Sequence, residues 1–216
     1  MQGIMQKISN IAIQEFGGRV ASTWEGLRAS TRSRVERALA SSAAPVSMRA
    51  ASTPYDARSE WELSRLLFAL DDRAKETDAP VLSRDEELEL IRLAETCALV
   101  LHGEARSAEV FAQLLERALR ARDYARVDVL ADTFSVRLAS TEICELARHP
   151  NPSLRALAHE ALAQSPTAVL VELLGDPVDS DVARDALELQ ADDYGSEEAR
   201  WVIGALERAD AAEDEV

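Results

Sequence analysis

A pattern repeated around two prolines restricts how this chain can fold more than any other feature. Residues 141–150 align with residues 167–177 when Pro150 is placed on Pro177. On both sides of each proline, apolar residues recur at helical spacing, which is typical of amphipathic helices. Each unit is therefore predicted to be a helix, a proline-containing turn and a second helix. Such units bury their apolar faces by stacking on one another, so the pattern predicts an all-helical array.

The turn and the helix after it resemble HEAT repeats over residues 139–191. In that family the second helix follows a turn of the type Asp-Pro-Asp and carries a Val-Arg pair and then spaced alanines. Residues 112–134 are instead similar to a tetratricopeptide-type helix pair, with Asp123-Tyr124 at the corner. The residues that carry the HEAT resemblance are His149-Pro150-Asn151, Leu154-Arg155, Ala158 and Ala161 in one unit, and Asp176-Pro177 and Val182 in the next.

Both resemblances imply one architecture, a right-handed solenoid of helix pairs that acts as a binding scaffold. They also imply structural roles for Pro150, Asn151, Asp176 and Pro177, which shape the turns. In HEAT-type stacks the equivalent of Arg155 bonds an acidic side chain or a turn carbonyl of a neighbouring unit, so the resemblance implies a structural strut here. The alternative is an arginine that faces a ligand.

The composition agrees with an all-α fold. Aromatic residues make up 5% of the 216 residues, and no run alternates apolar and polar residues long enough to predict a strand. We expect four parts along the chain: an amphipathic helical segment at 1–40, a flexible linker at 41–55, a helical-repeat domain at 56–208 and an acidic tail at 209–216.

The N-terminal segment carries one apolar helical stripe. Gly17-Gly18 interrupts it, and residues 22–25 can form a capping box that restarts the helix. Three interpretations stay open: the stripe folds back onto the first repeat, it binds a partner or a second copy, or it lies on a membrane surface. The candidate partner-binding residues of this stripe are Ile8, Phe16, Val20, Trp24 and Leu27.

The net charge of −15 is unevenly distributed. Residues 1–60 contain 8 basic and 5 acidic residues, whereas residues 61–216 contain 16 basic and 34 acidic residues. From residue 176 onward there are 14 acidic residues and 3 arginines. Because affinity for phosphates depends on lysine and arginine, the main body is not expected to bind nucleic acid. A protein partner with a basic surface fits this charge better.

Cysteine and histidine come closest to a chemical site, but their spacing argues against one. No further ligand follows Cys144, His149 and His159 at a suitable spacing, whereas structural zinc needs four. Cys97 and Cys144 lie in apolar helical patterns, which predicts buried, unreactive thiols in a reducing compartment. The sequence contains no glycine-rich phosphate loop and no hydrolase signature. We therefore predict no catalytic residue, no metal and no cofactor.

Two tryptophans are expected to be buried. Trp61 is expected to join Leu66 and Leu70 in the core, and Trp201 is expected on the buried face of the last helix. An alternative is that Trp201 and Tyr194, which lie among acidic residues, form an exposed contact for a basic peptide.

These features predict a non-enzymatic interaction scaffold, an adaptor or accessory subunit of a larger complex that presents an acidic helical surface. The first residues mix polar and apolar side chains, and the longest wholly apolar run, residues 97–101, is too short to cross a membrane. A cytoplasmic protein is therefore expected. Two alternatives stay open: a peripheral membrane accessory protein anchored by residues 4–39, and a HEAT-like enzyme of the lyase or glycosylase kind or an enzyme-modifying factor.

Overall fold

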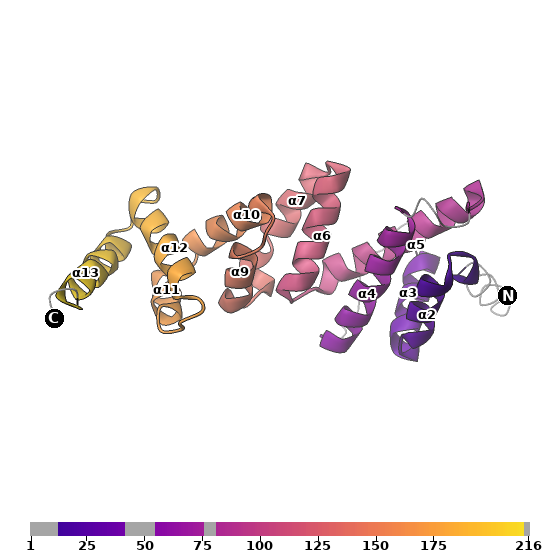
Figure 1. Ribbon diagram of the computed structural model, residues 1–216, viewed down its shortest axis with the longest axis horizontal. Helices are drawn as coiled ribbons and strands as arrows, with labels where there is room; N and C mark the ends of the chain where they lie inside the picture. The colour runs from indigo at the N-terminus through magenta and orange to yellow at the C-terminus, as the bar shows by residue number, and fades with distance from the viewer. Residues whose placement is uncertain (1–12, 42–54, 76–80, 214–216) are drawn as a thin grey trace. The chain divides into compact units, whose positions relative to one another are not determined.

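The computed structural model describes residues 13–41, 55–75 and 81–213. Within these ranges the chain forms α-helices and no β-strand, which confirms the predicted all-α class (Figure 1). The chain divides into two compact units, Met1–Ala105 and Arg106–Val216, designated unit 1 and unit 2. The division at residue 105 differs from the expected boundary near residue 55, because the N-terminal helices pack against the helices that follow them.

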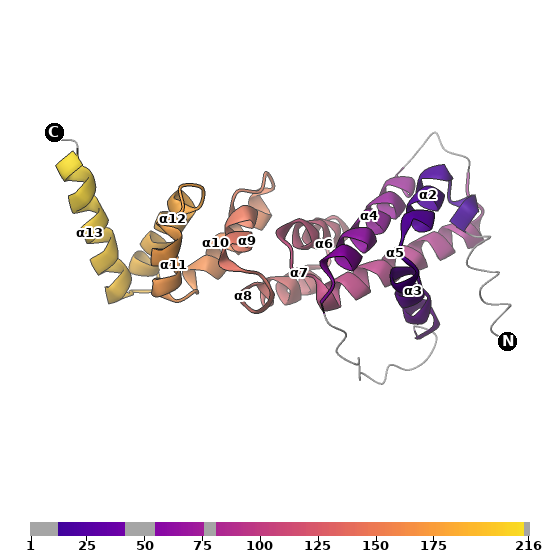
Figure 2. The same cartoon turned by 90° about the horizontal axis from the view of Figure 1, so that it is seen from below.

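Within the described residues of unit 1, helices α2 to α5 lie side by side. Helix α4 packs against α2 and α5, and α3 packs against α4 and α5 (Figures 1 and 2). The helices are α2 (Gly18–Gly26), α3 (Ala29–Ser41), α4 (Ala57–Arg73) and α5 (Arg84–Glu104).

The two longer helices of unit 1 begin at side-chain caps. Asp56 accepts hydrogen bonds from the amides of Arg58 and Ser59 and so satisfies two donors in the first turn of α4. Ser83 and Glu86 form the capping box that their Ser-x-x-Glu spacing predicts for the start of α5.

The apolar stripe of the N-terminal segment lies in the core of unit 1. Phe16, Val20, Trp24 and Leu27 are each at most 4% exposed. Burial of a side chain of this kind contributes about 1.5–3 kcal/mol, which favours this folded-back arrangement over exposure. These four residues are therefore interior residues in this structure and not an exposed partner-binding surface. The fifth candidate, Ile8, lies outside the described residues.

A buried carboxylate fixes α2 and α3 on α4. Glu62 of α4 accepts a hydrogen bond from Oγ1 of Thr31 at 2.6 Å and another from Nε of Arg28 at 2.9 Å. Burial works against ionisation of Glu62, but the hydrogen bonds from Thr31 and Arg28 outweigh it and hold its pKa below the ordinary value. Nearby, Nε of the buried Arg73 donates to the carbonyl of Phe16 at 2.9 Å. These polar contacts and the apolar core together hold the N-terminal helices against α4.

The breaks in the N-terminal helices lie partly where the sequence predicts them. Gly17 has a φ of 105° just before α2, which confirms the interruption at the glycines. Helix α2 runs through Ser22, so the capping box expected there is wrong, and the next break follows at Leu27. Most of the expected linker, residues 42–54, lies outside the described residues.

Unit 2 is a succession of shorter helices, each in contact with near neighbours along the chain. Helix α9 packs on α6 and α10, α12 packs on α9, α10, α11 and α13, and α13 also contacts α11 (Figure 1). The helices are α6 (Ala108–Ala121), α7 (Tyr124–Ala131), α8 (Phe134–Arg137), α9 (Ser140–Ala147), α10 (Pro152–Ala163), α11 (Thr167–Leu173), α12 (Ser180–Asp192) and α13 (Glu197–Glu213).

The corner between α9 and α10 has the construction predicted from its prolines. Asn151 caps α10 by accepting from the amide of Ser153 at 3.0 Å, and a proline occupies the first turn. Nη1 of Arg155 donates to the carbonyls of His149 and Pro150 at 3.0 and 2.8 Å. Arg155 is thus a strut, but it braces its own turn, whereas the resemblance implied a bond to the neighbouring unit.

Another arginine makes the link between the two corners. Nη1 of Arg148, after α9, lies 2.6 Å from Oδ1 of the buried Asp179, which precedes α12. Asp176 shapes this second turn through a 2.8 Å hydrogen bond from the amide of Val178, and Pro177 lies between them. The arginine therefore joins one proline turn to the next.

The end of α13 differs from the predicted tail. The helix continues to Glu213, so the tail expected from residue 209 begins inside it, and residues 214–216 lie outside the described residues.

Candidate protein-binding surface

Helix α13 leaves apolar side chains uncovered on unit 2. Ala199 is fully buried, but Val202, Ile203 and Leu206 are only half-buried, and Trp201 is 72% exposed. A helix turns by about 100° per residue, so Trp201 lies roughly 200° round the helix from Ala199. The expected burial of Trp201 is therefore wrong, and its indole faces solvent. Ile203 and Leu206 lie roughly 200° and 140° round the helix from Trp201, on the side of Ala199, whereas Val202 is about 100° from Trp201. We name Trp201 and the adjacent Val202 the α13 surface.

Acidic side chains flank the α13 surface. Glu197 and Glu198, both exposed, precede Trp201 by four and three residues and so share its side of the helix. The neighbouring helix α12 carries a further row of exposed carboxylates at spacings of four, three and four, which places them on one face. These residues are Asp181, Asp185, Glu188 and Asp192.

Tyr194, the other aromatic residue of the predicted exposed contact, is tied to an earlier helix. Its hydroxyl donates to Glu160 of α10, and Nε2 of Gln164 donates to the same carboxylate at 2.8 Å. The hydrogen bond to Glu160 raises the pKa of Tyr194 and lowers that of the carboxyl. The turn at Gly195, with a φ of 68°, separates this bond from α13. The ring remains half exposed.

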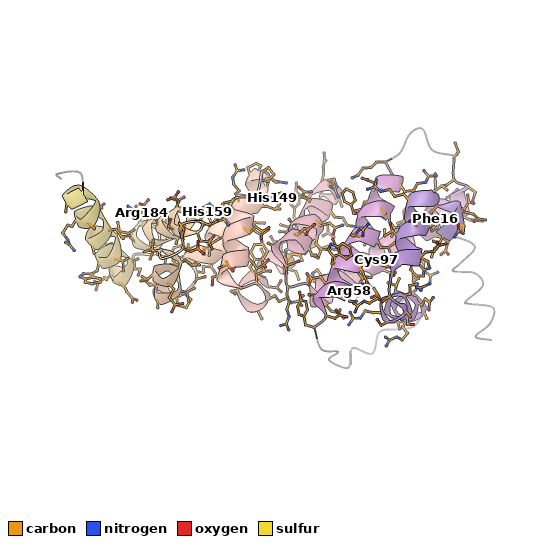
Figure 3. All side chains as sticks on the ribbon, turned by 60° about the horizontal axis from the view of Figure 1, so that its bottom comes forward. Phe16, Arg58, Cys97, His149, His159 and Arg184 are labelled. Atoms are coloured by element: carbon orange, nitrogen blue, oxygen red, sulfur yellow. The ribbon has the colours of Figure 1, made fainter. Side chains whose placement is uncertain are left out.

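Of the residues weighed for chemistry, His149 has a structural role and the two cysteines are buried. Nδ1 of His149 accepts from the amide of Asn151 at 3.2 Å, and His159 lies apart from it along unit 2 (Figure 3). Cys97 and Cys144 are free and buried, and burial raises the pKa of the two thiols to about 12 and about 11. Among the described residues, no group of three or more His, Cys, Asp or Glu side chains is placed to hold a metal ion.

Sequence reasoning missed a second exposed row on α4. Trp61, expected in the core, is 51% exposed, and Phe68 is 53% exposed, whereas Leu66 and Leu70 are buried as predicted. The signal was present in the spacing: Trp61 lies roughly 140° round the helix from Leu66, and Phe68 lies seven residues after Trp61 on the same side. The apolar residues of α4 thus form two faces.

Comparison with known protein families, curated proteins and solved structures found no match for this chain. A search of the described residues for a helix long and apolar enough to cross a membrane found none.

Proposed function

We propose that this chain is a non-enzymatic protein-binding module, an adaptor or accessory subunit that binds its partner at the α13 surface. The observation that carries the proposal is the 72% exposure of Trp201, a large aromatic side chain, on a side of α13 that also carries Glu197 and Glu198. Tryptophan is enriched among the residues that dominate the energy of protein interfaces, and an apolar centre with a polar rim is the usual anatomy of such interfaces.

The charge around the α13 surface defines the chemistry of the partner. Carboxylates flank Trp201 on its own helix and line α12, and residues from 176 onward contain 14 acidic residues and 3 arginines. A basic amphipathic segment, with apolar side chains on one face and lysine or arginine around them, complements this arrangement. Complementary charge also accelerates encounter and disfavours acidic competitors.

The packing of unit 2 supports a HEAT-like solenoid as the scaffold. The pairs α9–α10 and α11–α12 each meet at a proline turn, and α12 contacts both helices of the preceding pair. Arg148 and Asp179 join the two turns, and Gln190 of α12 donates to the carbonyls of Ala163 and Ser165 at the α10–α11 corner. Such links keep successive pairs in register, as a rigid binding scaffold requires. The free, buried thiols support a reducing compartment such as the cytoplasm.

Recovery of partners from a native lysate tests this function. Full-length protein is expected to recover a stoichiometric partner, and Trp201→Ala is expected to lose it. Val136→Ala is the matched control, because Val136 is also an exposed apolar residue of unit 2 but lies on α8. Failure to recover any stoichiometric partner, or equal recovery by Trp201→Ala and Val136→Ala, would count against the proposal.

A further inference from the structure

The outer face of α4 carries a row of alternating arginine and aromatic side chains, distinct from the α13 surface. Its residues recur at spacings of three and four, so they lie on one side of the helix, and Arg58 begins the row (Figure 3). We name this row the α4 stripe; its residues are Arg58, Trp61, Arg65, Phe68 and Asp72.

The core of unit 1 leaves both rings of the α4 stripe in solvent. Leu66, Leu67 and Leu70 of the same helix are buried, whereas about half of the surface of Trp61 and Phe68 is exposed. The seven-residue interval between the two rings spans about 10 Å along the helix axis. This separation matches the distance between side chains two turns apart on a second helix.

Arginines are held over both rings. Cζ of Arg65 lies 4.7 Å from the centre of the Trp61 ring, and Cζ of Arg19 lies 5.4 Å from that of Phe68. Arg19 is further fixed by Asp72, with 2.6 Å between Nη1 and Oδ2. Cation–π contacts of this kind order the long arginine side chains before any partner arrives, which lowers the entropic cost of binding.

We propose that the α4 stripe is a docking site for an acidic amphipathic segment of a protein partner. The guanidinium groups of Arg19 and Arg65 lie over the two rings. Arg58, one turn before Trp61, adds a third positive charge, with its Nε 3.4 Å from Oε1 of Glu62. Asp72 is the one carboxylate of the stripe. Apolar side chains of the partner cover the rings, and its carboxylates pair with the arginines, since arginine forms bidentate pairs with carboxylates.

The extent of the positive charge distinguishes this partner from a nucleic acid, which could also stack on the rings. The α4 stripe is a local group of arginines in a unit that contains 16 acidic and 13 basic residues, so it can pair with a few carboxylates but is not the extended basic track that a phosphate backbone needs. The α13 surface is flanked by acidic residues and takes a basic segment, so the two surfaces attract partners of opposite charge. The chain can then bind one partner on each unit, which is the property of an adaptor.

The test uses the full chain and two labelled synthetic helical peptides of 18 residues. One combines leucine at spacings of three and four with glutamate elsewhere, and the other replaces every glutamate with lysine. Fluorescence anisotropy is expected to show that the acidic peptide binds and that Trp61→Ala and Arg65→Glu each weaken its binding at least tenfold. Leu99→Ala, an exposed apolar residue of α5 in the same unit, and Trp201→Ala are the controls and are expected to bind normally.

Several results would overturn the proposal. The first is that the acidic peptide does not bind. The second is that Leu99→Ala weakens peptide binding as much as Trp61→Ala does, which would place the binding site outside the α4 stripe. Binding of an oligothymidylate that Trp61→Ala abolishes would assign the site to nucleic acid. A concentration-dependent dimer in sedimentation that Trp61→Ala abolishes would assign the stripe to a second copy. Because Trp201→Ala is tested alongside, failure of the α4 stripe proposal is distinguishable from failure of the proposal that the α13 surface binds a partner.

Discussion

Gly17 shows how a single residue determines the path of the chain in unit 1. Its φ of 105° and ψ of 160° lie in a region that is open essentially to glycine alone. Gly17→Ala is therefore expected to lower the free energy of unfolding by about 1–3 kcal/mol. The cost comes from the backbone, since an added Cβ would lie 3.8 Å from Nε of Arg73, an ordinary contact. Urea unfolding of the full chain, followed by circular dichroism, measures this loss.

The adjacent glycine provides the control. Gly18 is the first residue of α2, and an added Cβ there meets nothing within 4 Å. Gly18→Ala is expected to be neutral or to stabilise by up to about 1 kcal/mol, because alanine favours the helix. Equal destabilisation by the two substitutions would contradict the backbone explanation.

The reactivity of the two cysteines tests whether their side chains are buried. Burial raises the pKa of Cys97 to about 12 and that of Cys144 to about 11, so almost no thiolate exists at pH 8. Neither thiol is expected to react with Ellman's reagent in the native protein at that pH, and both are expected to react in guanidinium chloride. Rapid reaction of either thiol in the native state would show that its helix is not packed as described.

At the scale of elements, Glu62 makes the attachment of α2 and α3 to α4 sensitive to acid. Its folded-state pKa lies below the ordinary value of 4.5, so its contribution to stability is present above pH 4.5 and is lost as the pH falls through the folded-state pKa. The protection factors of the α2 and α3 amides against hydrogen exchange are therefore expected to fall below pH 4.5, as the pH passes through the folded-state pKa of Glu62.

Glu62→Gln is expected to remove much of this acid dependence and to cost about 1–3 kcal/mol at pH 7, because Arg28 and Thr31 lose a charged acceptor. Glu87→Gln, which replaces an exposed residue of α5, is the control and is expected to leave the acid dependence and the stability at pH 7 unchanged. An unaltered acid response in Glu62→Gln would exclude Glu62 as its origin.

The same scale shows which features of the fold could be predicted. Local chemistry determines the proline corner at Asn151 and the capping box at Ser83, so the sequence predicted both. The exposure of Trp61 and Trp201 depends on which neighbour covers each helix face, and local pattern does not contain that information. Each tryptophan lies two positions from a buried residue, roughly 200° round its helix, so apolar character alone suggested the wrong side.

The contacts of Glu62 could not be predicted from the sequence either. Thr31 and Glu62 are 31 residues apart, and nothing in the spacing of either helix predicts that they meet. For the same reason the sequence left open whether the N-terminal segment folds back, binds a partner or lies on a membrane, whereas in the structure it is an integral part of unit 1. Apolar and polar contacts between residues far apart in the sequence determine this arrangement.

At the scale of the whole molecule, the division into two units predicts how the chain responds to truncation. Removal of residues 1–55 takes away α2 and α3, which cover α4 and α5, so unit 1 is expected to lose its cooperative unfolding. A fragment that begins at Arg106 retains every helix of unit 2 and is expected to remain helical. Circular dichroism and thermal unfolding of the two fragments compare these outcomes.

A contrary result is easily recognised. Native-like stability of unit 1 in the fragment that begins at Asp56 would mean that the N-terminal helices are a detachable segment. Failure of the fragment from Arg106 to fold would mean that the two units are not independent.

The most direct test of the central claim, that the α13 surface binds a protein partner, is photo-cross-linking in the native cells. A benzophenone side chain at position 201 is expected to give one dominant adduct whose cross-linked segment is amphipathic and rich in lysine and arginine. The same group at position 136, exposed on α8, is expected to give no such adduct. Absence of an adduct at position 201, or the same adducts from both positions, would contradict the proposed function.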